Sequence, residues 1–226
     1  MLRAGRNDTP RAQQALAGLC QTYWYPLYAH VRRRGHGAHD AQDLTQEFFA
    51  RLLARQTLGR ADPARGRFRT FILTALDHFL ADEWDKSRAQ KRGGATELLS
   101  LDLAAAEQRF ELEPADTAAP DKAFDRQWAL ALLEAVLDQL ENEYRSDGKT
   151  DWFFALQPTL TGASESQPYA ELAARLDANE GAVKVAVHRL RKRYRALLQA
   201  KIVETVASPE EVPEEMRYLL QALAGG

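Results

Sequence analysis

The chain has 226 residues, of which 45% are hydrophobic and 27% charged, and its formal net charge is −2. This length allows one domain or two small ones, and the apolar content is enough for packed cores. The single cysteine, Cys20, excludes a disulfide framework and fits a reducing cytoplasm. We expect a cytoplasmic protein without membrane insertion, because no segment is apolar for long enough to span a bilayer and none reads as a signal peptide.

Three helices are expected in the first part of the chain, over residues 11–34, 40–58 and 68–88, since apolar residues recur there at helical spacing. The second of these helices begins with a polar patch at positions i, i+3 and i+4, formed by Asp43, Gln46 and Glu47. This patch is either an ordinary solvated first turn or a hydrogen-bonding surface for another protein, and the spacing alone does not separate the two.

A loop rich in arginine, residues 59–69, joins the second and third helices. Glycine and proline keep it irregular. Its cationic side chains are Arg60, Arg65, Arg67 and Arg69. Such a loop suits phosphate contact or capture of a single strand, although solvated arginines also gather on loops. The core face of the third helix is expected to contain Phe68, Ile72, Ala75, Leu76, Phe79, Leu80 and Trp84.

Residues 93–122 change in composition, with two prolines and more acids than bases, and indicate a weakly structured acidic linker. The linker separates an amino-terminal helical domain from a carboxy-terminal one. The second domain is expected to open with a periodic helix over residues 123–144. Its buried face contains Trp128, Leu132, Val136, Leu140 and Tyr144.

The pattern of residues 167–201 predicts a helix–turn–helix with a basic second helix. Asn179 can cap the amino terminus of that second helix. The apolar seam of that second helix consists of Val183, Val187, Leu190, Tyr194 and Leu197. A cationic stripe lies beside it, formed by Lys184, His188, Arg191 and Arg195. The pattern favours DNA binding through phosphates or the major groove, and the alternative is a solvated face on a packing helix.

A last amphipathic helix with net negative charge is expected over residues 212–223. It lies outside the helix–turn–helix unit and needs a partner surface, either on its own domain or on another protein. An enzyme or metal protein is a further alternative, because His36, His39, His78 and Cys20 are potential metal ligands. Their spacing fits no closed zinc site, and the chain lacks phosphate-loop and nucleophile-elbow motifs. We therefore expect no catalytic residue, metal or cofactor.

Two blocks, in this order, resemble bacterial RNA polymerase sigma factors of the small extracytoplasmic-function (ECF) type. DAQDLTQEFFARLL followed by RGRFRTFILTALDHFLADEW is similar to region 2, and YAELAARLDANEGAVKVAVHRLRKRYRALL is similar to region 4. The resemblance implies an all-α fold in which a region 2-like three- or four-helix bundle and a region 4-like helix–turn–helix domain are joined by a flexible acidic linker. The expected divisions are 1–92 for region 2, 93–122 for the linker, 123–201 for region 4 and 202–226 for a carboxy-terminal extension with a regulatory role.

The resemblance also implies roles for individual residues. The residues matching the core polymerase contact are Asp43, Gln46 and Glu47. Those matching the −10 DNA contacts are Arg60, Arg65, Arg67, Arg69, His78 and Asp82. Those matching the −35 contacts are Ala182, Lys184, Val185, His188, Arg189, Arg191 and Lys192. The implied partners are core RNA polymerase, promoter DNA, and an anti-sigma protein or a regulatory protein kinase.

Two other functions remain open on the sequence. The chain can be a transcription regulator that uses the helix–turn–helix alone, without polymerase. It can also be an interaction protein whose region 2-like half binds polymerase without initiating transcription.

Overall fold

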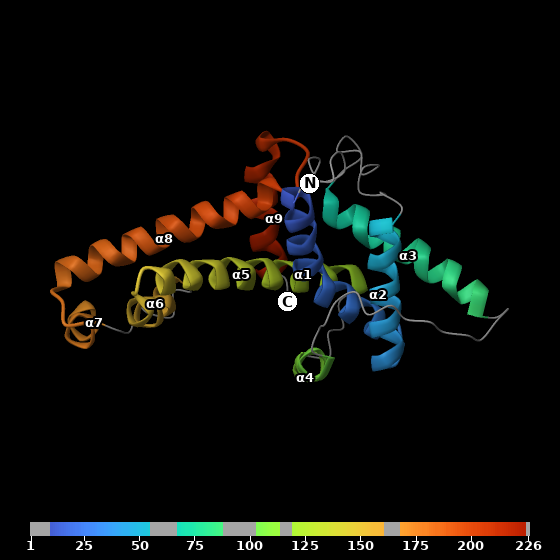
Figure 1. Ribbon diagram of the computed structural model, residues 1–226, viewed down its shortest axis with the longest axis horizontal. Helices are drawn as coiled ribbons and strands as arrows, with labels where there is room; N and C mark the ends of the chain where they lie inside the picture. Colours follow the sequence, from blue (N-terminus) through green and yellow to red (C-terminus); the bar gives the residue numbers. More distant parts are fainter. Residues whose placement is uncertain (1–9, 55–66, 88–102, 114–118, 161–167, 225–226) are drawn as a thin grey trace. The chain divides into compact units, whose positions relative to one another are not determined.

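The computed structural model describes residues 10–54, 67–87, 103–113, 119–160 and 168–224. These residues form nine α-helices with short 3₁₀ turns and contain no strand, so the all-α prediction is confirmed (Figure 1). The chain divides into two compact units, and each is described by itself. Unit 1 comprises Met1–Ala131 and Ile202–Gly226, and unit 2 comprises Leu132–Lys201.

Unit 1 is built on three helices, α1 (Pro10–Arg33), α2 (Ala38–Ala54) and α3 (Phe68–Ser87). α2 packs against both α1 and α3. The helical spacing of Tyr23, Leu27 and Val31 gave the right buried face for α1, since all three side chains are fully buried. The edge of the Tyr23 ring meets Phe68 at the start of α3, with 5.2 Å between ring centroids.

The core of α3 follows its apolar period except at Ala75, which is half-buried, and at Trp84. Ile72, Leu76 and Leu80 are buried, but Trp84, expected in the core, is exposed. Helical spacing assigns a residue to a face, but it does not show how far along the helix a neighbouring element covers that face.

The segment expected as a weakly structured linker contains a helix, α4 (Leu103–Leu112). Three consecutive alanines begin this stretch, and alanine is the strongest helix former. Tertiary contacts add to this preference, because Glu107 accepts hydrogen bonds from Arg32 of α1 at 2.8 and 3.1 Å and one from the Tyr28 hydroxyl. Glu113, just after α4, is held in the same way: it accepts hydrogen bonds from Arg33 and from the Tyr25 hydroxyl. The acids of this segment are therefore held by the basic end of α1.

Helix α5 (Pro120–Ser146) does not begin the second compact unit as expected. Its residues up to Ala131 belong to unit 1 and the rest to unit 2. Trp128, fully buried, lies in the unit 1 part, where Phe124 also meets the ring of His30. The strict four-residue period of α5 is uniform along the helix, so it contains no signal for this division.

Unit 1 is completed by residues from the end of the chain, the 3₁₀ turn Pro209–Glu211 and α9 (Val212–Ala224). The backbone N–H of Phe68, the first residue of α3, donates to the Thr205 carbonyl oxygen at 3.3 Å. Since the first N–H groups of a helix lack intrahelical partners, the segment before α9 satisfies one of them. Val212, Glu215 and Leu219 form the buried face of α9.

Unit 2 contains the second part of α5, α6 (Thr150–Leu156), α7 (Tyr169–Arg175) and most of α8 (Glu180–Val203). The predicted cap of α8 is confirmed, because the backbone N–H of Ala182 donates to the Asn179 side-chain oxygen at 2.8 Å. The seam residues Val183, Val187 and Leu190 are buried. α7 and α8 are therefore two successive helices separated by residues 176–179, and each has buried apolar residues.

A buried histidine gives unit 1 a pH dependence. His30 is completely buried, and its Nε2 lies 3.3 Å from the Asp77 carboxylate of α3. Burial and then Arg34 lower the pKa of His30, while Asp77 and Asp121 oppose the change. The folded chain therefore binds fewer protons here than the unfolded chain, and stability is expected to fall as the pH drops below about 6.5.

This expectation is checked by melting the protein between about pH 5 and pH 8. The melting temperature of unit 1 should fall on the acid side, and His30→Gln should flatten that part of the curve. His78→Gln serves as the control, since His78 is exposed on α3. If His30→Gln and the parent protein lose the same number of degrees, another group causes the acid sensitivity.

Candidate nucleic-acid interface

The polar patch near the start of α2 is only partly on the surface. Asp43 is exposed and Glu47 is half-exposed, but Gln46 is buried. Glu47 accepts a hydrogen bond from Arg51 at 2.7 Å, and Arg51 also reaches Glu83 of α3 at 2.8 Å. Arg51 thus ties α2 to α3 and keeps Glu47 in one position. The carboxylates of Asp43 and Glu47 remain available to a partner, whereas the Gln46 amide faces the interior.

One face of α3 is polar and open to solvent. His78 and Asp82, four residues apart, are both exposed, and Thr70 and Thr74 continue the same stripe toward the start of the helix. Residues at this spacing lie on one side of an α-helix. The two predicted α3 contacts for −10 DNA are therefore displayed together. Arg60 and Arg65 lie outside the described residues.

The other two arginines of the predicted loop are held inside unit 1. Arg69 is only 5% exposed. Its Nε donates to Glu215 at 2.9 Å, and one terminal nitrogen lies 3.4 Å from Asp125 of α5. Its guanidinium also stacks over the Tyr218 ring, 3.6 Å from the centroid. This structure therefore does not present Arg69 to DNA, because α5 and α9 surround it with acids and an aromatic ring, which local sequence around residue 69 does not indicate.

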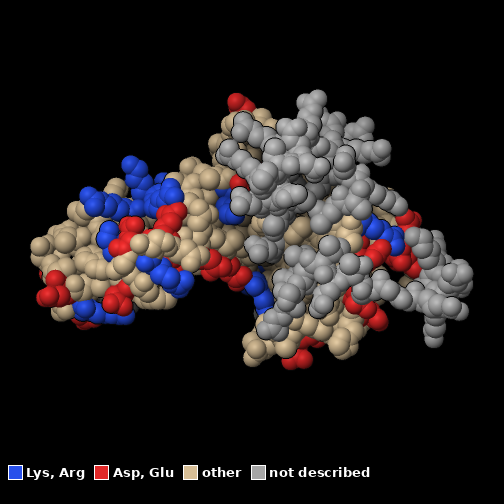
Figure 2. Space-filling view, viewed as in Figure 1, with Lys and Arg blue, Asp and Glu red and all other residues tan. Residues whose placement is uncertain are grey.

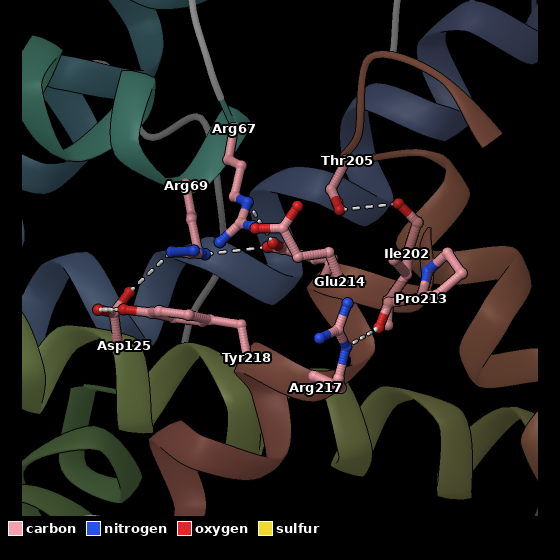
Figure 3. A network of polar contacts seen from close by, with 10 residues as sticks. Arg67, Arg69, Asp125, Ile202, Thr205, Pro213, Glu214, Arg217 and Tyr218 are labelled. Atoms are coloured by element: carbon pink, nitrogen blue, oxygen red, sulfur yellow. Dashed lines mark hydrogen bonds and ion pairs between the residues drawn. The ribbon is translucent and has the colours of Figure 1, made fainter. Parts of the chain in front are cut away.

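Arg67 lies at the edge of the same cluster (Figure 3). It is ion-paired with Glu214 and with Glu215, the latter at 2.9 Å from its Nε. The Tyr218 hydroxyl donates to Asp125 at 2.5 Å, which closes the network. Two guanidinium groups thus face three carboxylates. Burial raises the pKa of Glu215, against the opposing effect of Arg69 and Arg67.

The basic side of α8 carries most of the predicted −35 contacts. Figure 2 shows Lys and Arg side chains gathered over this helix. The exposed members of the predicted set are Ala182, Lys184, Val185, His188, Arg189, Arg191 and Lys192. Arg191 is also tied to the fold, since its guanidinium donates to the Thr159 carbonyl oxygen at 2.8 and 3.3 Å.

The exposed set on α8 divides between two sides of the helix. Lys184, His188 and Lys192 face outward, away from the apolar seam. On the other side, Ala182, Val185 and Arg189 line a groove of about 1060 Å³ that also includes Glu143 and Trp152. Arg193, absent from the predicted set, crosses this groove and binds Glu143 of α5 at 2.6 and 2.7 Å. Sequence periodicity could have placed Arg193 beside Arg189, but not opposite Glu143.

The described residues contain no group of three or more His, Cys, Asp or Glu side chains arranged to hold a metal ion. Cys20, one of the metal ligands considered, is buried, and burial raises the pKa of its thiol to about 11. Over the same residues, no helix is long and apolar enough to cross a membrane.

Comparison with known proteins places the three-helix part of unit 1 in a family. Residues 19–90 match the family model of sigma-70 region 2. The match extends over most of α1 and all of α2 and α3. No curated protein matches the chain, and no solved structure does.

Residues 19–90 are therefore similar to sigma-70 region 2, and this match supports a factor of the sigma-70 family. Region 2 supports a role in RNA polymerase binding and promoter melting, with core RNA polymerase and promoter DNA as partners. The match does not extend to α5–α9, so any role of these helices is argued from their own structure.

Proposed function

We propose that this protein is a cytoplasmic sigma factor of the ECF type, which binds core RNA polymerase and directs initiation at promoters with defined −10 and −35 elements. The observation that carries the proposal is the region 2 match over α1–α3, whose α2 presents exposed Asp43 and half-exposed Glu47. The succession of a short helix, α7, and a long basic helix, α8, supports a region 4-like role for unit 2.

We place the core polymerase contact on Asp43, which is exposed, and Glu47, which is half-exposed, whereas Gln46, the third residue of the predicted contact, is buried. The α3 stripe around His78 and Asp82 is the −10 surface in this proposal, and the outward cations of α8 are the −35 surface. Lys184, His188 and Lys192 then contact phosphates or base edges, since cationic side chains on a helix suit both.

Transcription in vitro tests the proposal. Core polymerase is supplied with the DNA upstream of the protein's own coding sequence, with and without the protein. We expect a discrete transcript only when both proteins are present, and its start site then locates the −10 and −35 elements. Co-elution with core but no transcript would support the alternative of an interaction protein. If the protein neither co-elutes with core nor yields a transcript, the sigma assignment is contradicted.

The core contact makes its own prediction. Asp43→Lys combined with Glu47→Lys is expected to weaken binding to core polymerase at least tenfold, or about 1.4 kcal/mol, because like charges replace complementary ones. Both positions are solvent-accessible, so the melting temperature should stay within a few degrees of the parent value.

Asp82→Lys is the control, since it reverses the charge of one carboxylate on the exposed face of α3. It should leave the affinity for core unchanged while altering promoter use. Affinity is measured by fluorescence anisotropy of the labelled protein titrated with core. If the control and the α2 variant lose the same affinity for core polymerase, the contact does not lie on α2.

A stand-alone helix–turn–helix regulator is the second candidate, and the exposed cations of α8 are the observation in its favour. It differs from a sigma factor in one measurable respect. A regulator binds duplex DNA tightly without polymerase, whereas a sigma factor depends on core for tight promoter binding. Electrophoretic mobility shift with the upstream DNA, in the presence and absence of core, decides between them.

A further inference from the structure

The start of α3 is covered by α9 through side chains of opposite charge. Arg67 and Arg69 come from α3 and the residue before it, while Glu214 and Glu215 are consecutive on α9 (Figure 3). The covered arginines belong to the segment proposed to face −10 DNA. Carboxylate oxygens and phosphate oxygens bind guanidinium groups in the same paired geometry. The two glutamates thus occupy positions that phosphates of a nucleic acid would take.

We propose that α9 competes with single-stranded DNA for Arg67 and must leave the start of α3 before unit 1 binds the strand. The inference rests on the proposed function, which places the −10 surface on α3, the helix that begins directly after Arg67. Arg67 is the residue that responds, because its side chain is 22% exposed and Glu214 beside it is 63% exposed. Arg69 is held on its other side by Asp125 of α5 and stays in place.

The packing of α9 on the start of α3 is weak enough for α9 to be displaced. Its buried side chains are Val212, Glu215 and Leu219, while the neighbouring Leu220 is exposed. One of the three buried residues is a carboxylate, and removing an ionised group from water offsets much of the gain from its ion pairs. The rim pair between Arg67 and Glu214 is exposed and therefore weak. A DNA strand offers several phosphates and competes for the same guanidinium.

The segment that precedes α9 also contacts the backbone of α3. The Thr205 carbonyl oxygen accepts the first N–H of α3, at Phe68. Withdrawal of the segment from Thr205 to α9 would leave this N–H free, and a free N–H at a helix amino terminus is itself an anion-binding group. Displacement of α9 thus exposes two donors for phosphate, the Arg67 guanidinium and the Phe68 amide.

The test compares two adjacent leucines of α9. Leu219→Ala removes apolar contact that docks the helix, while Leu220→Ala makes the same chemical change on the exposed side. The full-length proteins are titrated into a fluorescein-labelled single-stranded oligonucleotide with the −10 sequence, or a mixed-sequence strand until that element is mapped. We expect Leu219→Ala to bind about tenfold more tightly, because it raises the fraction of uncovered protein, and Leu220→Ala to bind as the parent does.

Two further measurements make the result decisive. Hydrogen exchange of the α9 amides shows whether the helix is released, and adding Arg67→Ala to Leu219→Ala should abolish the gain. Faster exchange in α9 without tighter binding would overturn the proposal and leave α9 as a structural element. The same conclusion follows if the gain survives loss of Arg67.

If Leu219→Ala does not fold, Glu214→Arg replaces it, because Glu214 is mostly exposed. The control is Glu210→Arg, which adds the same charge at an exposed position outside the cluster. Tighter binding by the first variant alone supports the competition, and equal binding by the two overturns it. Failure of the proposed function is separate: the parent and the variants would then all fail to bind core polymerase, whatever their affinity for the strand.

Discussion

Replacing Arg69 with alanine is expected to lower the free energy of unfolding of unit 1 by about 3–5 kcal/mol, because it removes one partner from a buried ion pair. The side chains of Arg69 and Glu215 are 6% and 1% exposed, so the carboxylate would stay buried without one of its two guanidinium partners. Asp125 and the Tyr218 ring would lose the same group. The loss is measured from urea unfolding, with hydrogen exchange of α3 and α9 assigning it to unit 1.

Arg67→Ala is the matched control for this prediction. Its side chain is more exposed than that of Arg69, its partner Glu214 is mostly solvated, and its other partner, buried Glu215, would keep Arg69, so the expected cost is about 1 kcal/mol. A small effect of Arg69→Ala, comparable to that of Arg67→Ala, would contradict a structural role for Arg69. It would return Arg69 to the list of candidate DNA contacts.

Replacing Trp128 with alanine is expected to destabilise unit 1 by about 3–5 kcal/mol, the usual cost of deleting a large buried aromatic side chain. Trp128 is completely buried and its ring lies 5.3 Å from the Arg69 guanidinium. Sequence spacing assigned this residue to the second domain, whereas the structure assigns it to unit 1. Hydrogen exchange should therefore accelerate in α1, α3 and α9.

Leu140→Ala provides the comparison within the same helix. Leu140 is also completely buried, but it belongs to unit 2. Its replacement should cost about 2–5 kcal/mol and accelerate exchange in α6, α7 and α8. If both variants accelerate exchange equally in all these helices, the chain unfolds as one cooperative body and the division within α5 has no thermodynamic meaning.

The acidic cluster around Arg69 bears on how such a protein is regulated. A buried ion network is weak evidence of stability, because apolar side chains of similar volume often stabilise as well or better. What the network does show is that it links two segments far apart in the chain, residues 67–69 and 214–218. Under the proposed competition, this link lets the end of the chain control access to the region 2 surface.

The sequence by itself determined most of the helices and most of their buried faces. Tyr23, Leu27 and Val31 in α1 and Val183, Val187 and Leu190 in α8 are buried as their spacing predicts. Helix periodicity is a local property, so it can be read without knowing the neighbours. The Asn179 cap is local for the same reason, and the region 2 blocks are continuous stretches of sequence that the family model matches.

Only the tertiary structure decided which polar residues are available. Gln46 is buried beside exposed Asp43, and Arg69 is enclosed by acids that lie far from it in the chain. It also decided that residues 103–112 form a helix against α1 and that α9 belongs to unit 1. The reason is physical: the exposure of a charge depends on groups brought near it by folding, and an ion pair across about 146 residues leaves no local pattern.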